Sequence, residues 1–345
     1  MSLRISSNSG EQHFQVVQRF LDGADQKEKT GEGSKELVPS VSDVTIEYQW
    51  YEKRPRRYVN HMDGTVHYAQ SRKVFIGESN SLPRLVVKIE DAKMRGKKLE
   101  LVLPHAEEIA YKICKMFHWN TVPKSKVLHQ YSALYIDPTR KLQKYIRLMA
   151  PFKNMEYPCT FTFQAFVAGQ ILPDVVTSKT RDPNPSSYQK AYLLGMVLGK
   201  FDARGDNAIH NHQTGELFEI DNEYIGKEGY KDSGILNQFR KLKRQEVPLQ
   251  ILNDVLSTQM IQLAQIRDKY KLRDDCLITS WSTEPYPEFL DCGSKKRDEY
   301  WSRIMENLTF LKMSIHALRE RKGPVTIEKL ARGVNKLYLM NKAIY

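Results

Sequence analysis

The sequence has little cysteine and no long apolar run, and both absences narrow what the protein can be. Its four cysteines, among 345 residues, lie far apart and form no CxxC pair. This excludes a disulfide framework and a zinc ribbon, and it predicts free thiols in a reducing compartment. No apolar run is long enough to cross a bilayer, and the first fifteen residues lack the apolar core of a signal peptide. We therefore expect a cytoplasmic protein.

Signatures of several enzyme and binding classes are also missing. The chain contains no HExxH pair, Walker loop, G-x-S-x-G elbow or G-x-G-x-x-G loop. It has no zinc-finger spacing, RNA-binding aromatic signature or helix-turn-helix, so no specific nucleic-acid partner is expected. His210 and His212 lie in an expected hairpin, and we expect both to face solvent rather than bind a metal.

Positive charge is what the sequence has in excess. The net charge is +12, which bears on partners rather than on fold. Five basic clusters hold much of this excess, at residues 54–57, 93–98, 240–244, 295–297 and 319–322. Each cluster alone is typical of a solvated surface. Together they favour a polyanionic partner, such as an anionic inositol phosphate, a phosphoinositide or an acidic membrane surface at which the protein is peripheral.

The pattern along the chain predicts three parts. Residues 1–42 are polar and predict a mobile N-terminal arm. Residues 43–163 alternate apolar and polar side chains in several strands and contain one amphipathic helix near 106–117, which predicts a strand-rich N-lobe. Residues 164–345 are mainly helical and predict a hinge and a helical C-lobe with a divergent C-terminal extension. We therefore expect a two-lobed α+β fold with a ligand cleft between the lobes.

The C-lobe begins with a helix that is apolar nearly all round, "YLLGMVLGKF", and is followed at once by polar groups. Asp202 and Asn207 lie in the next loop, and Asp221 follows a predicted hairpin of "AIH" and "ELFEI". Phosphoryl transfer needs oxygen ligands for a metal and a group that orients the acceptor hydroxyl. We therefore predict Asp202 as the general base, and Asn207 and Asp221 as ligands of Mg²⁺ or Mn²⁺ bound with ATP.

The N-lobe supplies a candidate cation for the phosphates. Lys88 lies in the apolar strand "LVVKIE", and Glu107 on the next helix is placed to pair with it. Each position also has an ordinary structural interpretation. In an alternating strand Lys88 would face solvent, and glutamates such as Glu107 and Glu108 are both common in a first helical turn. Asp202 would cap a turn. The order of these residues along the chain favours the phosphoryl-transfer hypothesis.

With these motifs the sequence resembles the phosphatidylinositol 3/4-kinase branch of the protein kinase superfamily, in particular type II phosphatidylinositol 4-kinases. "DARGDN" is similar to the family's catalytic loop, "IDNEYI" to its metal-binding segment and "EEIAYKICKMFHWNTVP" to its helix with the conserved glutamate, which favours Glu107 over Glu108. "FTFQAFVAG" resembles the segment before the hinge. The resemblance implies a protein-kinase-like atypical kinase with adenine beside Ala165, Phe166 and Val167.

Departures from the family pattern leave the acceptor open. Ala203 and Arg204 replace Arg-His, and Asn222 follows the metal aspartate in place of an aromatic residue. In place of a glycine-rich loop there is only "FIGESNS", where Gly77 and Ser79 are the candidates for binding phosphate. These features favour a divergent kinase of the bacterial effector type, delivered into a host cell, with a protein Ser/Thr acceptor. A phosphoinositide lipid kinase and a pseudokinase scaffold are the alternatives.

Overall fold

The computed structural model describes fourteen stretches of the chain: residues 49–52, 57–59, 66–68, 74–78, 84–91, 93–95, 98–100, 105–129, 159–171, 183–200, 207–222, 225–226, 239–281 and 288–344. Contacts divide the chain into two compact units. The first draws its described residues from Met1–Ala92 and Ser125–Phe166, and the second from Lys93–Lys124 and Val167–Tyr345. The predicted arm at residues 1–42 lies outside the described residues.

The first unit contains a five-stranded sheet. Its strand order is β1–β4–β5–β9–β8, and each neighbouring pair is antiparallel. A separate antiparallel pair joins β2 and β3. The strands of this unit are β1 (Gln49–Glu52), β2 (Arg57–Val59), β3 (Val66–Tyr68), β4 (Val74–Glu78), β5 (Leu85–Asp91), β8 (Ser125–His129) and β9 (Cys159–Ala165).

One face of this sheet carries buried polar side chains. Lys88 on β5 is the register partner of Thr162 on β9, and Gln164, two residues further along β9, is the partner of Ser125 on β8. Register partners, and residues two apart on one strand, lie on the same face of a sheet. All four side chains are buried, and Lys88 is only 6% exposed. The solvent-facing alternative for Lys88 is therefore wrong.

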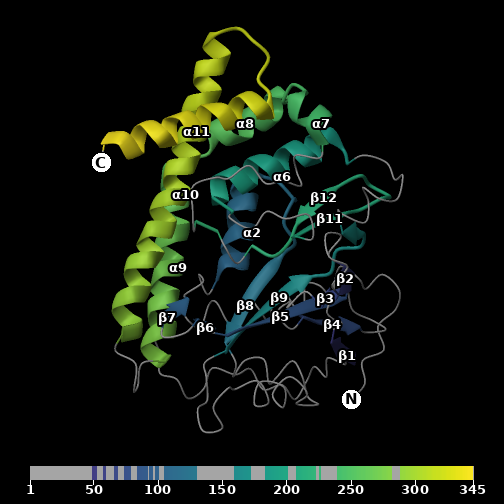
Figure 1. Ribbon diagram of the computed structural model, residues 1–345, viewed down its shortest axis with the longest axis vertical. Helices are drawn as coiled ribbons and strands as arrows, with labels where there is room; N and C mark the ends of the chain where they lie inside the picture. The colour runs from purple at the N-terminus through teal and green to yellow at the C-terminus, as the bar shows by residue number, and fades with distance from the viewer. Residues whose placement is uncertain are drawn as a thin grey trace. The chain divides into compact units, whose positions relative to one another are not determined.

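The second unit is mainly helical and contains most of the buried apolar side chains of the described chain. In Figure 1, α9 and α10 run side by side, and α11 crosses the end of α10. Its helices are α2 (Ala106–Met116), α6 (Pro185–Leu198), α7 (Arg240–Arg244), α8 (Leu249–Ser257), α9 (Met260–Trp281), α10 (Glu288–Glu320) and α11 (Ile327–Ile344).

Small strands complete the second unit. β6 (Lys93–Arg95) pairs with β7 (Lys98–Glu100), and β11 (Ala208–His210) lies between β10 (Gln170–Ile171) and β12 (Leu217–Glu219) in an antiparallel three-stranded sheet. The predicted hairpin is thus confirmed. The added strand β10 was not predicted.

Helix α6 is buried on nearly all sides, as its apolar sequence predicts. It begins at Pro185, directly after Asn184, whose side-chain oxygen accepts a hydrogen bond from the backbone N–H of Ser186 at 2.9 Å. It ends at Gly199, which has a left-handed φ of 58° and forms the C-cap. α6 therefore has a defined start, a defined end and no solvent-facing stripe, and it positions the segment that follows it.

Within the C-lobe region that the sequence predicts as mainly helical, residues 249–281 form two helices rather than one. α8 ends at Ser257, and Thr258 is extended with φ −61° and ψ 126°. The hydroxyls of Ser257 and Thr258 both bond the carbonyl oxygen of Asp254, at 3.3 and 2.8 Å. Such local side-chain bonds to the backbone compete with helix continuation, which an apolar pattern alone does not reveal.

The described helices also bear on membranes and on the aromatic residues. No described helix is long and apolar enough to cross a membrane. Tyr300 and Trp301 are buried in the core of the second unit. The α+β character predicted from the sequence is confirmed by the sheet of the first unit and the helices of the second.

Candidate active site

The strongest candidate site lies where the hairpin β11–β12 ends. Ala208 on β11 pairs with Glu219 on β12, and the ladder continues outward, since the backbone N–H of Ile220 donates to the carbonyl oxygen of Asn207 at 2.8 Å. Asn207 is buried at 6% exposure, and Asp221 is half-buried. The hairpin thus brings the backbones of the two predicted metal ligands close together, although they are fourteen positions apart in the sequence.

Asp221 has an unusual backbone. Its φ is +60°, and it is one of only three non-glycine residues with positive φ in the described part of the chain. A left-handed conformation costs an L-residue free energy, and such residues persist only where the surroundings fix them. Strained residues of this kind concentrate at functional sites. The conformation of Asp221 is therefore an independent reason to examine this turn.

A buried lysine fixes the backbone next to Asp221. Lys200, just after α6, is 2% exposed, and its Nζ donates to the carbonyl oxygen of Ile220 at 2.9 Å. Nζ also lies 3.8 Å from Oε2 of the buried Glu219, an ion pair beyond hydrogen-bond distance. Burial raises the pKa of Glu219, and the Lys200 ammonium opposes that rise. A Cβ at Gly195 would lie 3.2 Å from Oε1 of Glu219, so α6 packs closely on this pair.

Helix α2 is joined to the same turn. Nδ2 of Asn222 donates to Oε2 of Glu107 at 2.9 Å, and both side chains are buried. The backbone N–H of Glu219 donates to the carbonyl oxygen of Thr121, which follows α2, at 2.7 Å. Neither contact is visible in the spacing of the sequence. The role of Asn222 in particular was missed, because the sequence presents it only as a departure from a family pattern.

The adjacent carboxylate, Glu108, contacts α9. Its Oε1 accepts a hydrogen bond from the Tyr270 hydroxyl of α9 at 2.8 Å, and the Tyr270 ring lies 5.5 Å from the ring of His105. Glu107 and Glu108 are both about 1% exposed. The family resemblance favoured Glu107 over Glu108, and within the second unit it is Glu107 that contacts the turn after β12.

The predicted metal fits the donors at this turn. No three His, Cys, Asp or Glu side chains of the described chain gather into a cluster that could bind a metal by themselves. Asn207 and Asp221 offer a carboxamide and a carboxylate, which are oxygen donors only. Mg²⁺ and Mn²⁺ accept a small number of protein oxygens and complete their coordination with phosphates and water. This donor set fits them and does not fit zinc.

The sheet of the first unit also has features of a ligand site. Oγ1 of Thr162 and Nε2 of Gln164 are buried and bond no described residue. Most buried polar atoms in proteins have a partner. Because both lie on the face that carries Lys88, this face is a plausible place for a polar ligand. Neither residue was singled out from the sequence, since each is unremarkable in a strand.

The other predicted residues have the following places. Gly77 is buried on β4 opposite Leu85, and Ala165 ends β9. The backbone N–H of Phe166 donates to the carbonyl oxygen of Arg84, whose guanidinium lies 5.5 Å from the Phe166 ring. Val167 is half-buried at the start of the following segment. Ser79 and Asp202 lie outside the described residues, so their predicted roles stay predictions.

His210 is not solvent-facing, and that prediction is wrong. It is fully buried, because β11 is the central strand between β10 and β12. The ring of His212 lies 5.0 Å from that of His210, edge to face. The expectation failed because β10 has only two residues and gives no sequence signal of its own.

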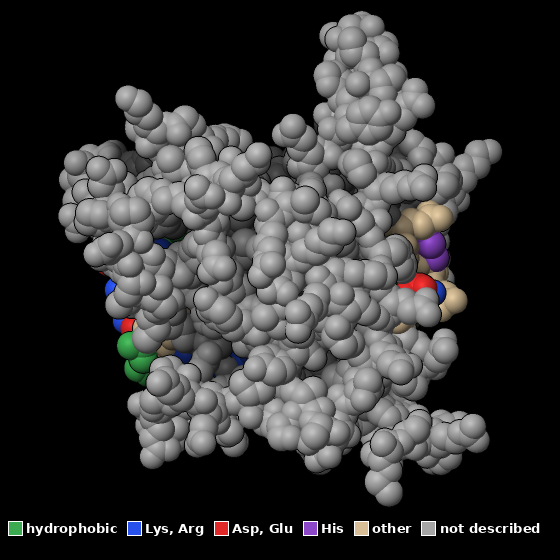
Figure 2. All heavy atoms as spheres, turned by 90° about the horizontal axis from the view of Figure 1, so that it is seen from below, with side chains coloured by type: hydrophobic (Ala, Val, Ile, Leu, Met, Phe, Trp, Pro, Cys, Tyr) green, Lys and Arg blue, Asp and Glu red, His purple; other side chains and the backbone are tan. Residues whose placement is uncertain are grey.

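In the basic cluster at residues 240–244, two side chains contact other parts of the second unit. Nζ of Lys243 lies 5.2 Å from the centre of the Tyr192 ring, and Nε of Arg244 is 3.4 Å from Oε2 of Glu328. In Figure 2, the described basic side chains that reach the viewed face lie beside acidic ones at its margins, with histidine at one of them. Part of this charge is therefore used within the fold.

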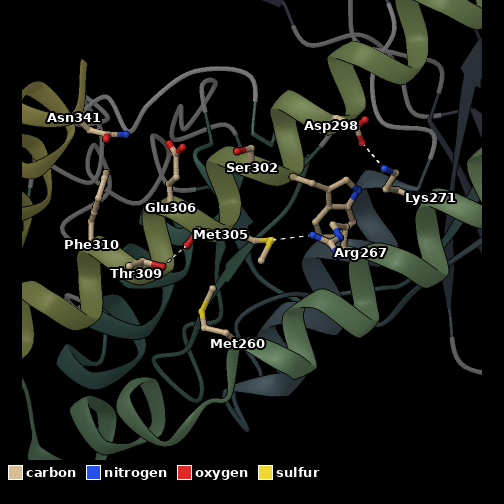
Figure 3. Close-up of a pocket in the computed structure, with 11 residues that line it drawn as sticks. Met260, Arg267, Lys271, Asp298, Ser302, Met305, Glu306, Thr309, Phe310 and Asn341 are labelled. Carbon is tan, nitrogen blue, oxygen red and sulfur yellow. Dashed lines mark hydrogen bonds and ion pairs between the residues drawn. The ribbon is translucent and has the colours of Figure 1, made fainter. Parts of the chain in front are cut away.

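A separate groove lies between α9, α10 and α11. It has a volume of about 750 Å³ and is lined by Met260, Trp301, Met305, Phe310 and seven polar or charged side chains. Figure 3 shows two polar contacts within its wall: Nζ of Lys271 is 2.5 Å from Oδ1 of Asp298, and Nη1 of Arg267 donates to Sδ of Met305. None of the predicted catalytic or metal-binding residues lines it.

Comparison with known proteins adds little to this geometry. The sequence matches no protein-family model and no curated protein. Two solved structures are similar at 11% identity. The Golgi casein kinase with Mn/ADP bound has a TM-score of 0.35, and the match covers 74% of this chain and 72% of that chain. A second structure of the Golgi casein kinase has a TM-score of 0.37, and the match covers 74% of this chain and 73% of that chain. A likeness at these TM-scores supports no functional conclusion, so the proposal below rests on residues of this chain.

Proposed function

We propose that this protein is an atypical kinase, an ATP- and Mg²⁺-dependent phosphotransferase that acts on a hydroxyl acceptor. One observation carries the proposal: the hairpin β11–β12 places Asn207 beside the turn of Asp221, and Asp221 is held there with a φ of +60°. Two oxygen donors in a fixed, strained turn are what phosphoryl transfer needs from a protein that binds a metal–nucleotide complex.

In the second unit, Asp221 and Asn207 hold the metal, which when bound neutralises phosphate charge and orients the transferred group. Lys200 keeps the carbonyl of Ile220 in place, so the Asp221 carboxylate has a fixed origin. Asp202 orients the acceptor hydroxyl and accepts its proton. The assignment of Asp202 follows from its spacing of five residues before Asn207 in the sequence.

In the first unit, Lys88 binds phosphate oxygens through its ammonium. Its burial, at 6% exposure, on a sheet face that carries further polar side chains supports this. Thr162 and Gln164 supply further polar atoms on the same sheet face. Gly77 and Ser79 bind phosphate through their backbone, and Ala165, Phe166 and Val167 lie along the adenine. The pairing of Lys88 with Glu107 stays a prediction.

The acceptor that we propose is a protein Ser or Thr hydroxyl, with an anionic inositol phosphate or phosphoinositide as a ligand or regulator. The net charge of +12 and the basic clusters support an anionic ligand. A panel of lipids and a cell lysate, each incubated with labelled ATP, separates the two acceptor classes. Label confined to lipid would reject the protein acceptor and favour a phosphoinositide kinase.

The proposal is tested by phosphotransfer and by nucleotide binding with matched variants. We expect Asp221→Ala to lower phosphotransfer at least about a hundredfold, because it removes a metal ligand. Asp268→Asn is the control, since Asp268 is exposed and contacts Arg267 on α9. Wild-type rates in Asp221→Ala would refute the assignment. Stabilisation by Mg²⁺ and ATP without transfer to any acceptor would identify a nucleotide-binding scaffold instead.

A further inference from the structure

The residue after the candidate metal ligand makes a buried contact whose purpose the proposed reaction does not explain. Asn222 is fully buried, and its amide nitrogen donates to Glu107 on α2 at 2.9 Å. The amide oxygen of Asn222 accepts no hydrogen bond from the described residues. The contact of Asn222 with α2 therefore depends on its donor, which an apolar residue or a carboxylate at this position could not replace.

The contact joins two elements that are far apart in the sequence. Glu107 and Asn222 are separated by 115 positions. Next to Glu107, the carboxylate of Glu108 accepts from the Tyr270 hydroxyl of α9. Successive residues of a helix point about 100° apart, so the two carboxylates fix the rotation of α2 from two directions. α9 holds one side of the helix, and the turn after β12 holds the other.

The same contact acts on the strained turn. Lys200 holds the carbonyl just before Asp221, and Asn222 anchors the chain just after it. A left-handed aspartate between two anchors cannot relax to a common backbone conformation without breaking one of them. The Asn222–Glu107 bond is therefore placed to hold the conformation of Asp221 and the rotation of α2 together.

We infer that Asn222 is a positioning residue, which holds the metal-binding turn of Asp221 in register with α2 through its hydrogen bond to Glu107. The inference rests on the proposed function, since the metal-binding role of Asp221 belongs to it. Loss of this bond should release both elements together. It should lower phosphotransfer without removing any group that touches the nucleotide or the acceptor.

The test uses Asn222→Asp, which keeps the size of the side chain and replaces the donor by a second carboxylate. A carboxylate at this position has no N–H to donate to Glu107, and it repels the Glu107 carboxylate. We expect phosphotransfer to fall at least about tenfold below wild type. A wild-type rate in Asn222→Asp would overturn the inference.

Asn307→Ala is the matched control. Asn307 is also a buried asparagine of the second unit, and its Nδ2 donates to the carbonyl oxygen of Val197 at 3.4 Å. It should lower stability without a comparable loss of phosphotransfer. An equal loss of phosphotransfer in Asn307→Ala would overturn the inference, because the loss would then not be specific to the Glu107 contact.

Two further measurements keep the test decisive. If Asn222→Asp does not fold, Glu107→Gln in the same chain should restore folding, because it rebuilds an amide–carboxylate hydrogen bond in the reverse direction. Failure of this rescue counts against the inference.

Amide hydrogen exchange without nucleotide should be at least about tenfold faster in both α2 and residues 219–222 of Asn222→Ala than in wild type, and in neither segment of Asn307→Ala. Unchanged exchange would overturn the inference. Exchange does not require activity, so a wild-type protein that binds no nucleotide would refute the proposed function alone.

Discussion

Replacing Asp221 by glycine and by alanine measures the strain in the candidate site. Both variants remove the carboxylate, so they differ in how well they accept a φ of +60° and in the entropy of the unfolded chain. A left-handed residue with a Cβ costs about 1–2 kcal/mol, and the larger unfolded-state entropy of glycine returns about 0.4–1 kcal/mol of that difference. We therefore expect Asp221→Gly to be more stable than Asp221→Ala by about 1 kcal/mol.

The assay is urea unfolding in the presence of EDTA, so that no metal contributes to the free energy of unfolding. The control is the corresponding pair of variants at position 213, Gln213→Gly and Gln213→Ala. Gln213 is exposed in the loop of the same hairpin and is not among the described residues with positive φ. There, alanine should be the more stable substitution by about 0.4–1 kcal/mol. The sign of the Gly-minus-Ala difference should thus reverse between positions 221 and 213, and the same sign at both would refute the strained turn.

Stability and activity should separate at this position. Asp221→Gly and Asp221→Ala should both lose phosphotransfer, although glycine relieves strain. Asp221→Asn should keep most of the stability, because asparagine tolerates the left-handed region well, yet it should bind metal more weakly. Such a separation of stability from activity is expected where a strained backbone serves function.

Three further predictions follow from other parts of the second unit. Burial raises the pKa of Glu219, and Lys200 opposes that rise, so the contribution of the protonated Glu219 to stability is present below the ordinary glutamate pKa and falls as the pH rises through the folded value. Glu219→Gln should remove this part of the pH dependence of urea unfolding between pH 4 and 8. An unchanged profile would contradict the prediction. Burial also raises the pKa of Cys114, so in a variant with no other cysteine a maleimide should react only as fast as the protein unfolds. Lys312→Met removes a donor to two carbonyls at the end of α8 and should cost about 1 kcal/mol in thermal unfolding; no loss would mean that water replaces the donor.

The sequence predicted the elements whose patterns are local. α6 is apolar on every side and carries its own N-cap asparagine and C-cap glycine, so its bounds could be predicted to within a few residues. The hairpin β11–β12 was readable from two short alternating segments around a turn. The break between α8 and α9 was not, because it depends on hydroxyls that bond the helix backbone.

The site was predictable only in part, for a physical reason. Oxygen donors that a hairpin brings together, such as Asn207 and Asp221, can be inferred from spacing and strand pairing. The side chains that hold them, Lys200 and Asn222, act through single hydrogen bonds to distant or backbone atoms. No periodicity encodes such bonds, and the left-handed φ of Asp221 has no sequence signature, since aspartate is common in every kind of loop.

The central claim is that Asp221 belongs to a metal–nucleotide site, and a calorimetric titration of ATP with Mg²⁺ into the full chain tests it most directly. Wild type and Asp268→Asn should bind with equal affinity. Asp221→Ala should bind at least about tenfold more weakly, and the difference should disappear when EDTA replaces the metal. Equal affinities of wild type and Asp221→Ala in the presence of Mg²⁺ would contradict the account.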